Sequence, residues 1–310
     1  MKRGLLYIAL AAISWGVGGF VAALLYRHAG LGPFAVTFWR YLGGLVLLAA
    51  YLRRMPRRRI LNGLGMALYQ TAYYVAIDLG GVGIVTVVTL GSGPVIIALA
   101  ERSFIRHAKI LAAALLGLGL LVAQNPQTGP HPLAGIAVAL VSAGGYAGVT
   151  LLNRARSDDP YDSALGGFAV GTVALLPLAA VEGLAPRAEH LGVTIGLLAF
   201  LGAVPTALAY ALFFRGLQVI RATTASVVAL SEPLAAVALG ALVLHEPLTA
   251  WSVAGGLLLL GSVAALALQE RPGREPRGGD ERGEAPQPEM RSAFRNRTGN
   301  ASRRRWRALR

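Results

Sequence analysis

Residues 222–244 read ATTASVVALSEPLAAVALGALVL, an apolar run interrupted near its middle by one acid, Glu232. A membrane-spanning helix needs about 20 mostly apolar residues, because each residue adds about 1.5 Å toward a hydrocarbon core of about 30 Å. Pro233 follows the acid directly, and a proline inside a helix removes one backbone hydrogen bond. The stretch therefore predicts a membrane-spanning helix with a polar group and a helix break near its centre.

The whole chain shares the apolar character of this stretch. Of its 310 residues, 55% are hydrophobic and only 14% are charged, and the mean hydropathy is +0.57. An average soluble domain has about 25% charged residues, so this chain lacks the polar side chains to cover a water-facing surface. Cysteine is absent, which excludes disulfides, thiolate metal sites and a cysteine nucleophile. The composition predicts an integral membrane protein.

Ten segments of the sequence are long and apolar enough, some only marginally, to cross a membrane as helices. They run roughly over Leu5–Tyr26, Pro33–Leu52, Ile60–Leu79, Val82–Ala100, Ile110–Ala123, Leu133–Leu152, Ser163–Val181, Leu191–Phe214, Ala222–Leu244 and Trp251–Leu268. The connections between them are a few residues long, which is too short for a domain outside the membrane. We therefore expect an all-α integral membrane protein with ten transmembrane helices.

Lysine and arginine residues gather at one end of these predicted helices. With the amino terminus inside, 14 of them lie at cytoplasmic ends and only two, Arg27 and Arg187, lie in outer loops, before the carboxy-terminal tail is counted. Positive charge marks the cytoplasmic side of a membrane protein. We therefore expect insertion in the cytoplasmic (inner) membrane with both termini in the cytoplasm. The first apolar run is too long for a secretory signal, so we expect it to remain uncleaved.

The formal net charge of +14 raises the question of nucleic-acid binding. Residues 271–310 contain 12 arginines, against 6 acidic residues in 270–310, and most other lysines and arginines lie at span ends. Charge in these places meets anionic lipid headgroups, so we expect lipid as a partner and no nucleic acid. Residues 270–310 lack apolar periodicity and are rich in proline, glycine and arginine, which predicts a disordered cytoplasmic tail.

The two halves of the chain share a weak internal repeat. Val87-Val88-Thr89-Leu90-Gly91-Ser92 aligns with Val227-Val228-Ala229-Leu230-Ser231-Glu232, and Pro94 then matches Pro233. We expect one five-span repeat over residues 1–126 and a second over 132–268. Five is an odd number of spans, so the second repeat must run in the opposite orientation, which is the inverted-repeat plan of many secondary transporters.

Several short motifs resemble a known family, the drug/metabolite transporter superfamily and in particular its ten-span EamA-type permeases. The resemblance covers residues 5–268, and its motifs are Ser14-Trp15-Gly16, Phe38-Trp39-Arg40-Tyr41, Ser231-Glu232-Pro233, Leu244-His245-Glu246-Pro247-Leu248 and a glycine-rich last span. The resemblance implies export of small organic solutes, with amino acids and related metabolites the first expectation. The first half departs from the pattern, because Gly91-Ser92-Gly93-Pro94 has no acid and Arg106-His107-Ala108 stands in place of a Gly-Glu turn.

Aromatic and polar side chains at the centre of several spans are the candidates for substrate binding. Aromatic residues of membrane proteins usually collect at the two interfaces, so at mid-depth they indicate a lined cavity or, alternatively, packing against glycine-rich neighbours. An aromatic cavity with few fixed charges suits an amphipathic or zwitterionic solute. The predicted substrate-binding residues are Trp15, Gln70, Tyr73, Tyr74, Tyr146 and Tyr210.

Two charged residues lie within predicted spans, where charge is costly. Glu232 is either a carboxylate that responds to protons or a substrate amine, or a structural acceptor for backbone groups freed by Pro233. Arg40 is either the counter-ion of a substrate carboxylate or the structural partner of an acid. Pro94 and Pro233 are predicted helix breaks in corresponding spans, a pattern that points to a transporter's binding region and also fits kinks that serve packing.

The sequence lacks the motifs of membrane-embedded hydrolases and nucleotide-driven pumps. It has no Gly-x-Ser-x-Gly, no His-Glu-x-x-His and no Walker loop, and the five histidines lie near span ends, so we expect no metal site and no cofactor. Our prediction is a secondary transporter that works by alternating access around a central cavity. Alternatives are a multidrug or nucleoside permease of the same fold, a passive channel, and an intramembrane enzyme. The oligomeric state is left open.

Overall fold

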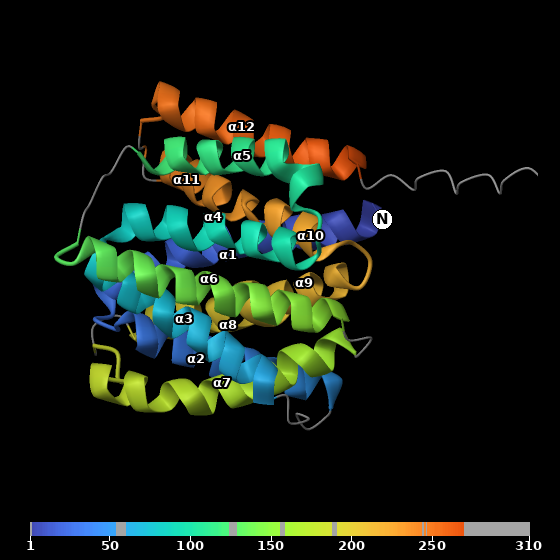
Figure 1. Ribbon diagram of the computed structural model, residues 1–310. Coiled ribbons are helices and arrows are strands. Elements are labelled where there is room, and N and C mark those ends of the chain that lie inside the picture. Colours follow the sequence, from blue (N-terminus) through green and yellow to red (C-terminus); the bar gives the residue numbers. More distant parts are fainter. Residues whose placement is uncertain are drawn as a thin grey trace, which may run out of the picture. The chain divides into compact units, whose positions relative to one another are not determined.

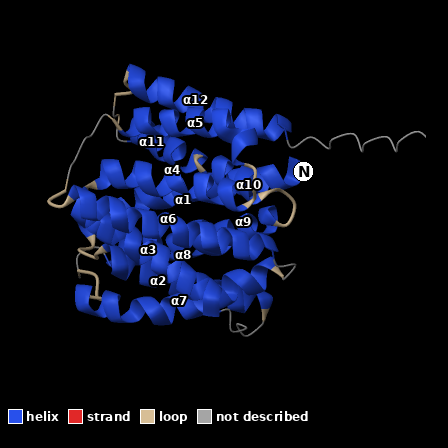
Figure 2. Cartoon of the chain, in the orientation of Figure 1, coloured by secondary structure: helices blue, strands red, loops and turns tan. Residues whose placement is uncertain are grey.

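The computed structural model describes residues 2–53, 60–123, 129–155, 159–187, 191–243, 245 and 247–269, and within them every regular element is a helix (Figures 1 and 2). The elements are α1 (Lys2–His28), α2 (Pro33–Leu52), α3 (Ile60–Gly80), α4 (Val82–Ala100), α5 (Phe104–Val122), α6 (Pro132–Ala155), α7 (Pro160–Glu182), α8 (Leu191–Gly202), the π-helix η1 (Ala203–Leu208), α9 (Ala209–Leu217), α10 (Ala222–Ala229), α11 (Ser231–Val243) and α12 (Ala250–Gln269). The prediction of an all-α membrane protein is confirmed.

These elements form ten rods, because α8, η1 and α9 make one continuous span (Leu191–Leu217) and α10 and α11 make another (Ala222–Val243). Within the described residues, nine of the ten rods are long and apolar enough to cross a membrane. The remaining rod is α3, which carries Asn62, Gln70 and Asp78. Asn62 is buried between α6 and α7, where it donates a hydrogen bond to the Ser163 carbonyl and accepts one from Asn153, whereas Gln70 and Asp78 belong to the lining of the cavity described below.

The packing of the first five rods repeats in the second five. Helix α3 packs on α6 just as α9 packs on α1, and α4 packs on α6 as α10 and α11 pack on α1. The pairs α2 with α7 and α5 with α12 meet across the two halves, at opposite edges of the bundle in Figure 1. Each half has an odd number of rods, so α1 and α6 run in opposite directions. This is the arrangement of two inverted five-helix repeats.

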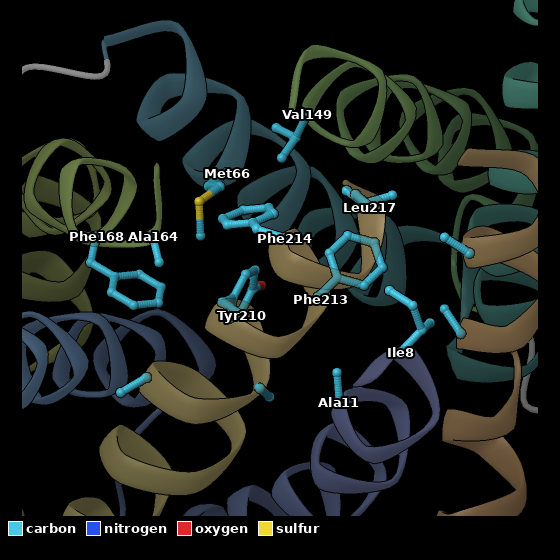
Figure 3. Close-up of a cluster of buried hydrophobic side chains, with 14 of the residues drawn as sticks. Ile8, Ala11, Met66, Val149, Ala164, Phe168, Tyr210, Phe213, Phe214 and Leu217 are labelled. Carbon is cyan, nitrogen blue, oxygen red and sulfur yellow. The ribbon is translucent and has the colours of Figure 1, made fainter. Parts of the chain in front are cut away.

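One end of the bundle is filled by an apolar core. The core includes Ile8 near the start of α1, Met66 near the start of α3, and Phe213, Phe214 and Leu217 of α9, each at most 2% exposed (Figure 3). These residues belong to the end at which α1 begins, which is also where most basic residues lie. Among the described residues, this end of the bundle is thus closely packed with apolar side chains.

Candidate functional site

A cavity of about 700 Å³ lies between the two halves of the bundle. Its walls come from α1, α2, α3, α4 and α6 and from the eighth and ninth rods. Clefts of about 300–1,000 Å³ are typical of small-molecule binding sites. The cavity is therefore large enough for an amino acid or a somewhat larger metabolite.

The cavity gathers the residues that the sequence singled out as binding candidates. Its lining includes all six predicted substrate-binding residues and both buried charges, namely Trp15, Gln70, Tyr73, Tyr74, Tyr146, Tyr210, Arg40 and Glu232. They come from six different rods, so only the tertiary fold brings them together. A role in substrate binding stays a prediction for each of them.

The aromatic side chains form a connected wall. Trp15 packs on Tyr210 with ring centroids 5.2 Å apart, and Tyr146 packs on Tyr69 with centroids 6.1 Å apart at an interplanar angle of 86°. Tyr73 and Tyr74 lie 5.6 Å apart. Tilted and edge-to-face contacts of this kind stabilise aromatic clusters. The wall therefore presents ring faces and edges to a solute in a fixed arrangement.

Hydrogen bonds hold several of these rings in place. The hydroxyls of Tyr69 and Tyr210 hydrogen-bond to each other across the two halves of the chain. The Tyr73 hydroxyl lies 3.3 Å from the Thr86 hydroxyl oxygen of α4. The backbone carbonyl of Tyr69 accepts a hydrogen bond of 2.8 Å from Ser142 of α6. Side chains locked in this way form a site that is largely preformed.

Two donors on the wall have no hydrogen-bond partner. In the part of the chain that the structure describes, this holds for the buried Trp15 Nε1 and Tyr146 hydroxyl, both of which belong to cavity-lining residues. Leaving a buried polar group unpaired costs about 1–3 kcal/mol. Both atoms have almost no accessible surface, so a solute in the cavity could reach them only after neighbouring side chains move.

Arg40 lies on α2 and is 9% exposed. Its Nε donates a hydrogen bond of 3.3 Å to the hydroxyl oxygen of Thr206, which belongs to η1 of the other half. Arginine stays charged at any physiological pH. The cavity therefore contains a permanent positive charge that is oriented from one side by the eighth rod.

Glu232 lies in the first turn of α11, directly after the point where the ninth rod divides at Leu230. The negative charge of its carboxylate is favourable at a helix amino terminus. Gly16 of α1 packs against this break, since a Cβ atom at Gly16 would lie 2.5 Å from the Glu232 carbonyl oxygen. The position of Glu232 thus depends on a glycine in the first rod.

The two proline positions differ in the structure. Pro233 lies three residues after Leu230, where the ninth rod divides into α10 and α11. Pro94 lies inside α4, which continues as one helix from Val82 to Ala100, so the helix break predicted at Pro94 is absent from the described backbone. Gly91 and Gly93 are both buried beside Pro94. Helix α4 thus continues through Pro94 although the proline removes one backbone hydrogen bond. Neither proline belongs to the cavity lining.

Several lining residues were not among the predicted ones. Tyr69 shares a helix face with Tyr73 in the sequence, and Asp78 marks the end of α3, but Tyr26, Ser142 and Ser226 gave no separate signal. The serines are ordinary residues of helices rich in small side chains. Their place in the wall follows from packing between remote helices, which a single sequence does not specify.

The cavity extends toward the end of the bundle opposite the apolar core. Its lining reaches the α1–α2 connection at Leu31 and Gly32, and the exposed residues Asp78 and Val82. The other end is tied by Glu101, whose carboxylate accepts hydrogen bonds from the backbone N–H groups of Ala222 and Thr223 at 3.1 and 3.0 Å. Glu101 is not among the residues that the sequence singled out.

The described residues contain no candidate metal site. No group of three or more His, Cys, Asp or Glu side chains lies close enough together there to hold an ion. The polar groups of the cavity are hydroxyls, one indole N–H, an amide, a guanidinium and carboxylates. This set suits recognition of an organic solute by hydrogen bonds and charge.

A membrane-embedded bundle of two inverted halves around a solute-sized cavity is the architecture of many membrane transporters. Comparison with known proteins agrees. The profile of the EamA-like transporter family matches residues 133–268. A protein of Pseudomonas aeruginosa is 30% identical over 294 residues, which cover 90% of this chain and 99% of that protein. The chain belongs to the EamA-like transporter family.

Two further comparisons support this assignment. The uncharacterized transporter YwfM of Bacillus subtilis is 29% identical over 276 residues, covering 83% of this chain and 91% of the relative. One solved crystal structure has the same fold with a TM-score of 0.70 at 20% identity, covering 87% of this chain and 99% of the other. The protein is therefore an integral membrane transporter of the drug/metabolite transporter superfamily.

Proposed function

We propose that this transporter exports amino acids or chemically related zwitterionic metabolites by alternating access around the described cavity. The observation that carries the proposal is the presence of both Arg40 and Glu232 in the lining of one cavity with aromatic walls. A zwitterion offers a carboxylate to the guanidinium and an ammonium to the carboxylate. The ammonium can also approach the ring faces of the tyrosines and Trp15 through cation–π contact.

The direction of transport rests on the family resemblance. The excess of basic residues at the end where α1 begins supports an orientation with both termini in the cytoplasm of an inner-membrane protein. In that orientation the cavity faces outward and the apolar core closes the cytoplasmic side. Export then requires a second conformation in which the core opens and the outer end closes. The basic tail, residues 270–310, lies outside the described residues, and we propose that it binds anionic lipid.

The proposal is tested by counterflow in proteoliposomes that contain the purified full chain. Vesicles preloaded with unlabelled amino acid receive a panel of radiolabelled amino acids, with and without a pH gradient, for wild type and Glu232→Gln. We expect saturable exchange of one chemical class of amino acid. If Glu232 also couples transport to protons, Glu232→Gln removes the effect of the gradient. Because its carboxylate is the proposed ligand of the ammonium, we expect the exchange that remains at equal pH to have a higher KM.

Two results would redirect the proposal. If no amino acid exchanges under either condition, the substrate class is wrong and drugs or nucleosides become the next panel. If labelled solute equilibrates without saturation and without stimulation by the preloaded amino acid, the protein is a channel. The fold and the family assignment do not depend on either result.

A further inference from the structure

We propose that Thr206 is a positioning residue, which orients the Arg40 guanidinium into the cavity and thereby sets the affinity for a solute carboxylate. The inference rests on the proposed function for the nature of the solute. It concerns a residue that does not itself line the cavity and that nothing in the sequence marks.

The Thr206 side chain is fully buried and makes two hydrogen bonds, one as a donor and one as an acceptor. Its hydroxyl donates to the carbonyl oxygen of Leu201 at 2.7 Å, and it accepts from Arg40 Nε at 3.3 Å. A hydroxyl has a single proton to donate. Because that proton is used by Leu201, the lone pairs of the oxygen are directed to the guanidinium. Thr206 is thus held as an acceptor for Arg40.

The π-helical turn explains why a threonine hydroxyl serves the Leu201 carbonyl. In an α-helix this carbonyl would accept from the N–H of residue 205, but residue 205 is a proline and has no N–H. The wider turn of η1 brings residue 206 to the same carbonyl. π-Helical turns occur frequently at functional sites. Pro205 thus leaves the Leu201 carbonyl without its α-helical donor, and the Thr206 hydroxyl supplies a donor in its place.

Two glycines allow Pro205 and Thr206 to pack closely against α1 and α2. A Cβ atom at Gly44 of α2 would lie 2.8 Å from the Thr206 methyl carbon, and one at Gly18 of α1 would lie 2.7 Å from Pro205. Gly44 lies four residues after Arg40, on the same face of α2. The close approach of α2 to η1 thus fixes the distance between Arg40 and Thr206.

Holding Arg40 through Nε has a consequence for binding. The hydrogen bond to Thr206 uses Nε alone, and the two terminal nitrogens of a guanidinium form a fork that can bind a carboxylate through two parallel hydrogen bonds. An arginine free to rotate would lose this advantage, because ordering a long side chain costs entropy. Thr206 therefore preorganises the site for a carboxylate without touching the solute.

The first test compares Thr206→Val, which removes the hydroxyl and keeps the shape, with Thr206→Ser, which keeps the hydroxyl. Thr172→Val is the control, since Thr172 is a buried α7 threonine whose hydroxyl has no partner among the described residues. Counterflow of the transported amino acid gives KM and maximal rate for each variant. Competition by the corresponding amide, which lacks the carboxylate, gives its inhibition constant.

We expect Thr206→Val to raise KM for the amino acid by about tenfold or more, as for loss of a hydrogen bond to a charged group. The maximal rate and the inhibition constant of the amide stay near wild type, and Thr206→Ser restores KM to within about twofold. The inference is overturned if Thr206→Val behaves like Thr172→Val. It is equally overturned if the variant loses affinity for the amide as much as for the amino acid.

A second measurement needs no substrate. Phenylglyoxal modifies arginine, and peptide mass spectrometry gives the rate at Arg40 in the purified full chain. We expect Thr206→Val to react several-fold faster at Arg40 than wild type, and Thr206→Ser to react as wild type does. Equal rates in wild type and Thr206→Val refute the positioning role. If wild type exchanges no amino acid, the proposed function fails while this rate still decides the role of Thr206.

Discussion

Tyr73 faces the cavity from the middle of α3, where its hydroxyl is held by Thr86. Replacing Tyr73 by alanine removes both a ring face and a fixed hydroxyl, so we expect KM to rise by about tenfold or more. Tyr51→Ala is the matched control, because Tyr51 is 79% exposed and lies outside the cavity. Counterflow kinetics of both variants check the prediction, and a Tyr73→Ala protein that transports like Tyr51→Ala would refute it.

Gly16 is the residue on which the position of Glu232 depends. A methyl group at Gly16 would meet the Glu232 carbonyl oxygen at 2.5 Å and the Ala235 side chain at 2.7 Å, so Gly16→Ala must push α1 away from α11. We expect the melting temperature to fall by several degrees, as for other overpacked contacts. Gly19→Ala on the same helix meets nothing within 4 Å and should melt near wild type. Equal melting temperatures of the two variants would show that α1 and α11 are not in tight contact.

Part of the site could be predicted from single residues, and part could not. Tyr73, Tyr146 and Tyr210 were predictable because aromatic side chains at mid-depth are unusual in a membrane protein. Thr206 was not predictable, since its role depends on Arg40, 166 residues away in the chain. Glu232 could be singled out because an acidic side chain is energetically costly in an apolar span, but only the structure places it in the lining of the same cavity as Arg40.

At the scale of elements, a carboxylate from one half caps a helix of the other half at each end of the bundle. Glu101, after α4, accepts from the first two backbone N–H groups of α10 and from the Thr223 hydroxyl at 2.6 Å. Glu182, at the end of α7, accepts from the Ala35 N–H near the start of α2 at 2.6 Å. Such caps stabilise a helix terminus by about 0.5–2 kcal/mol. They join the two halves at places where the proposed alternating access would require the halves to separate.

The cap at Glu101 gives a prediction about closure of the end that carries the apolar core. Glu101→Ala removes three hydrogen bonds to α10, so we expect this end to open more often, by about tenfold. The chain has no cysteine, which allows Ala225→Cys, a fully buried position of α10, to report opening. The rate of maleimide labelling of Ala225→Cys is measured with and without Glu101→Ala.

The control for this experiment is Glu182→Ala, which removes a cap at the other end of the bundle. It should leave the labelling rate of Ala225→Cys near that of the parent. If Glu101→Ala also leaves the rate unchanged, or if Glu182→Ala raises it equally, Glu101 has no specific part in closing this end. The assignment of the cap as a closing contact would then be wrong.

Most elements were predictable from hydropathy, with two exceptions that have physical causes. The eighth rod reads as an ordinary apolar span, and the π-turn at Pro205 and Thr206 depends on close contacts from Gly18 and Gly44. Pro94 looks like a break but lies in a continuous helix. Local sequence gives the tendency of a proline to disrupt a helix, whereas neighbouring helices decide whether the helix bends.

For the whole molecule, the two inverted halves enclose the described cavity, which extends toward one end of the bundle. The two halves have related packing but different side chains, and in this conformation the apolar core fills the end where α1 begins. The ten-span count was predictable from the spacing of the apolar runs. The opposite orientation of the second repeat was predictable because each repeat has an odd number of spans. The cavity's dimensions were not, because they depend on glycine contacts between remote helices.

The orientation of the molecule gives a prediction that needs no substrate. With basic residues gathered at one end, we expect Lys2→Cys to face the cytoplasm and Ala185→Cys, on the exposed α7–α8 connection, to face outward. A membrane-impermeant maleimide added to intact cells should label only Ala185→Cys. Labelling of Lys2→Cys in intact cells, with Ala185→Cys protected, would reverse the assigned orientation.

In our proposal, opposite charges in one cavity recognise a zwitterion. Competition with altered substrates tests this recognition. Counterflow of the transported amino acid is measured against its amide, which lacks the carboxylate, and its N-acetyl derivative, which lacks the ammonium. We expect wild type to bind both at least about tenfold more weakly than the amino acid. Arg40→Gln should lose the preference over the amide alone, and Glu232→Gln the preference over the N-acetyl derivative alone. Equal inhibition of wild type by all three compounds, or variants that keep the wild-type ranking, would contradict the account.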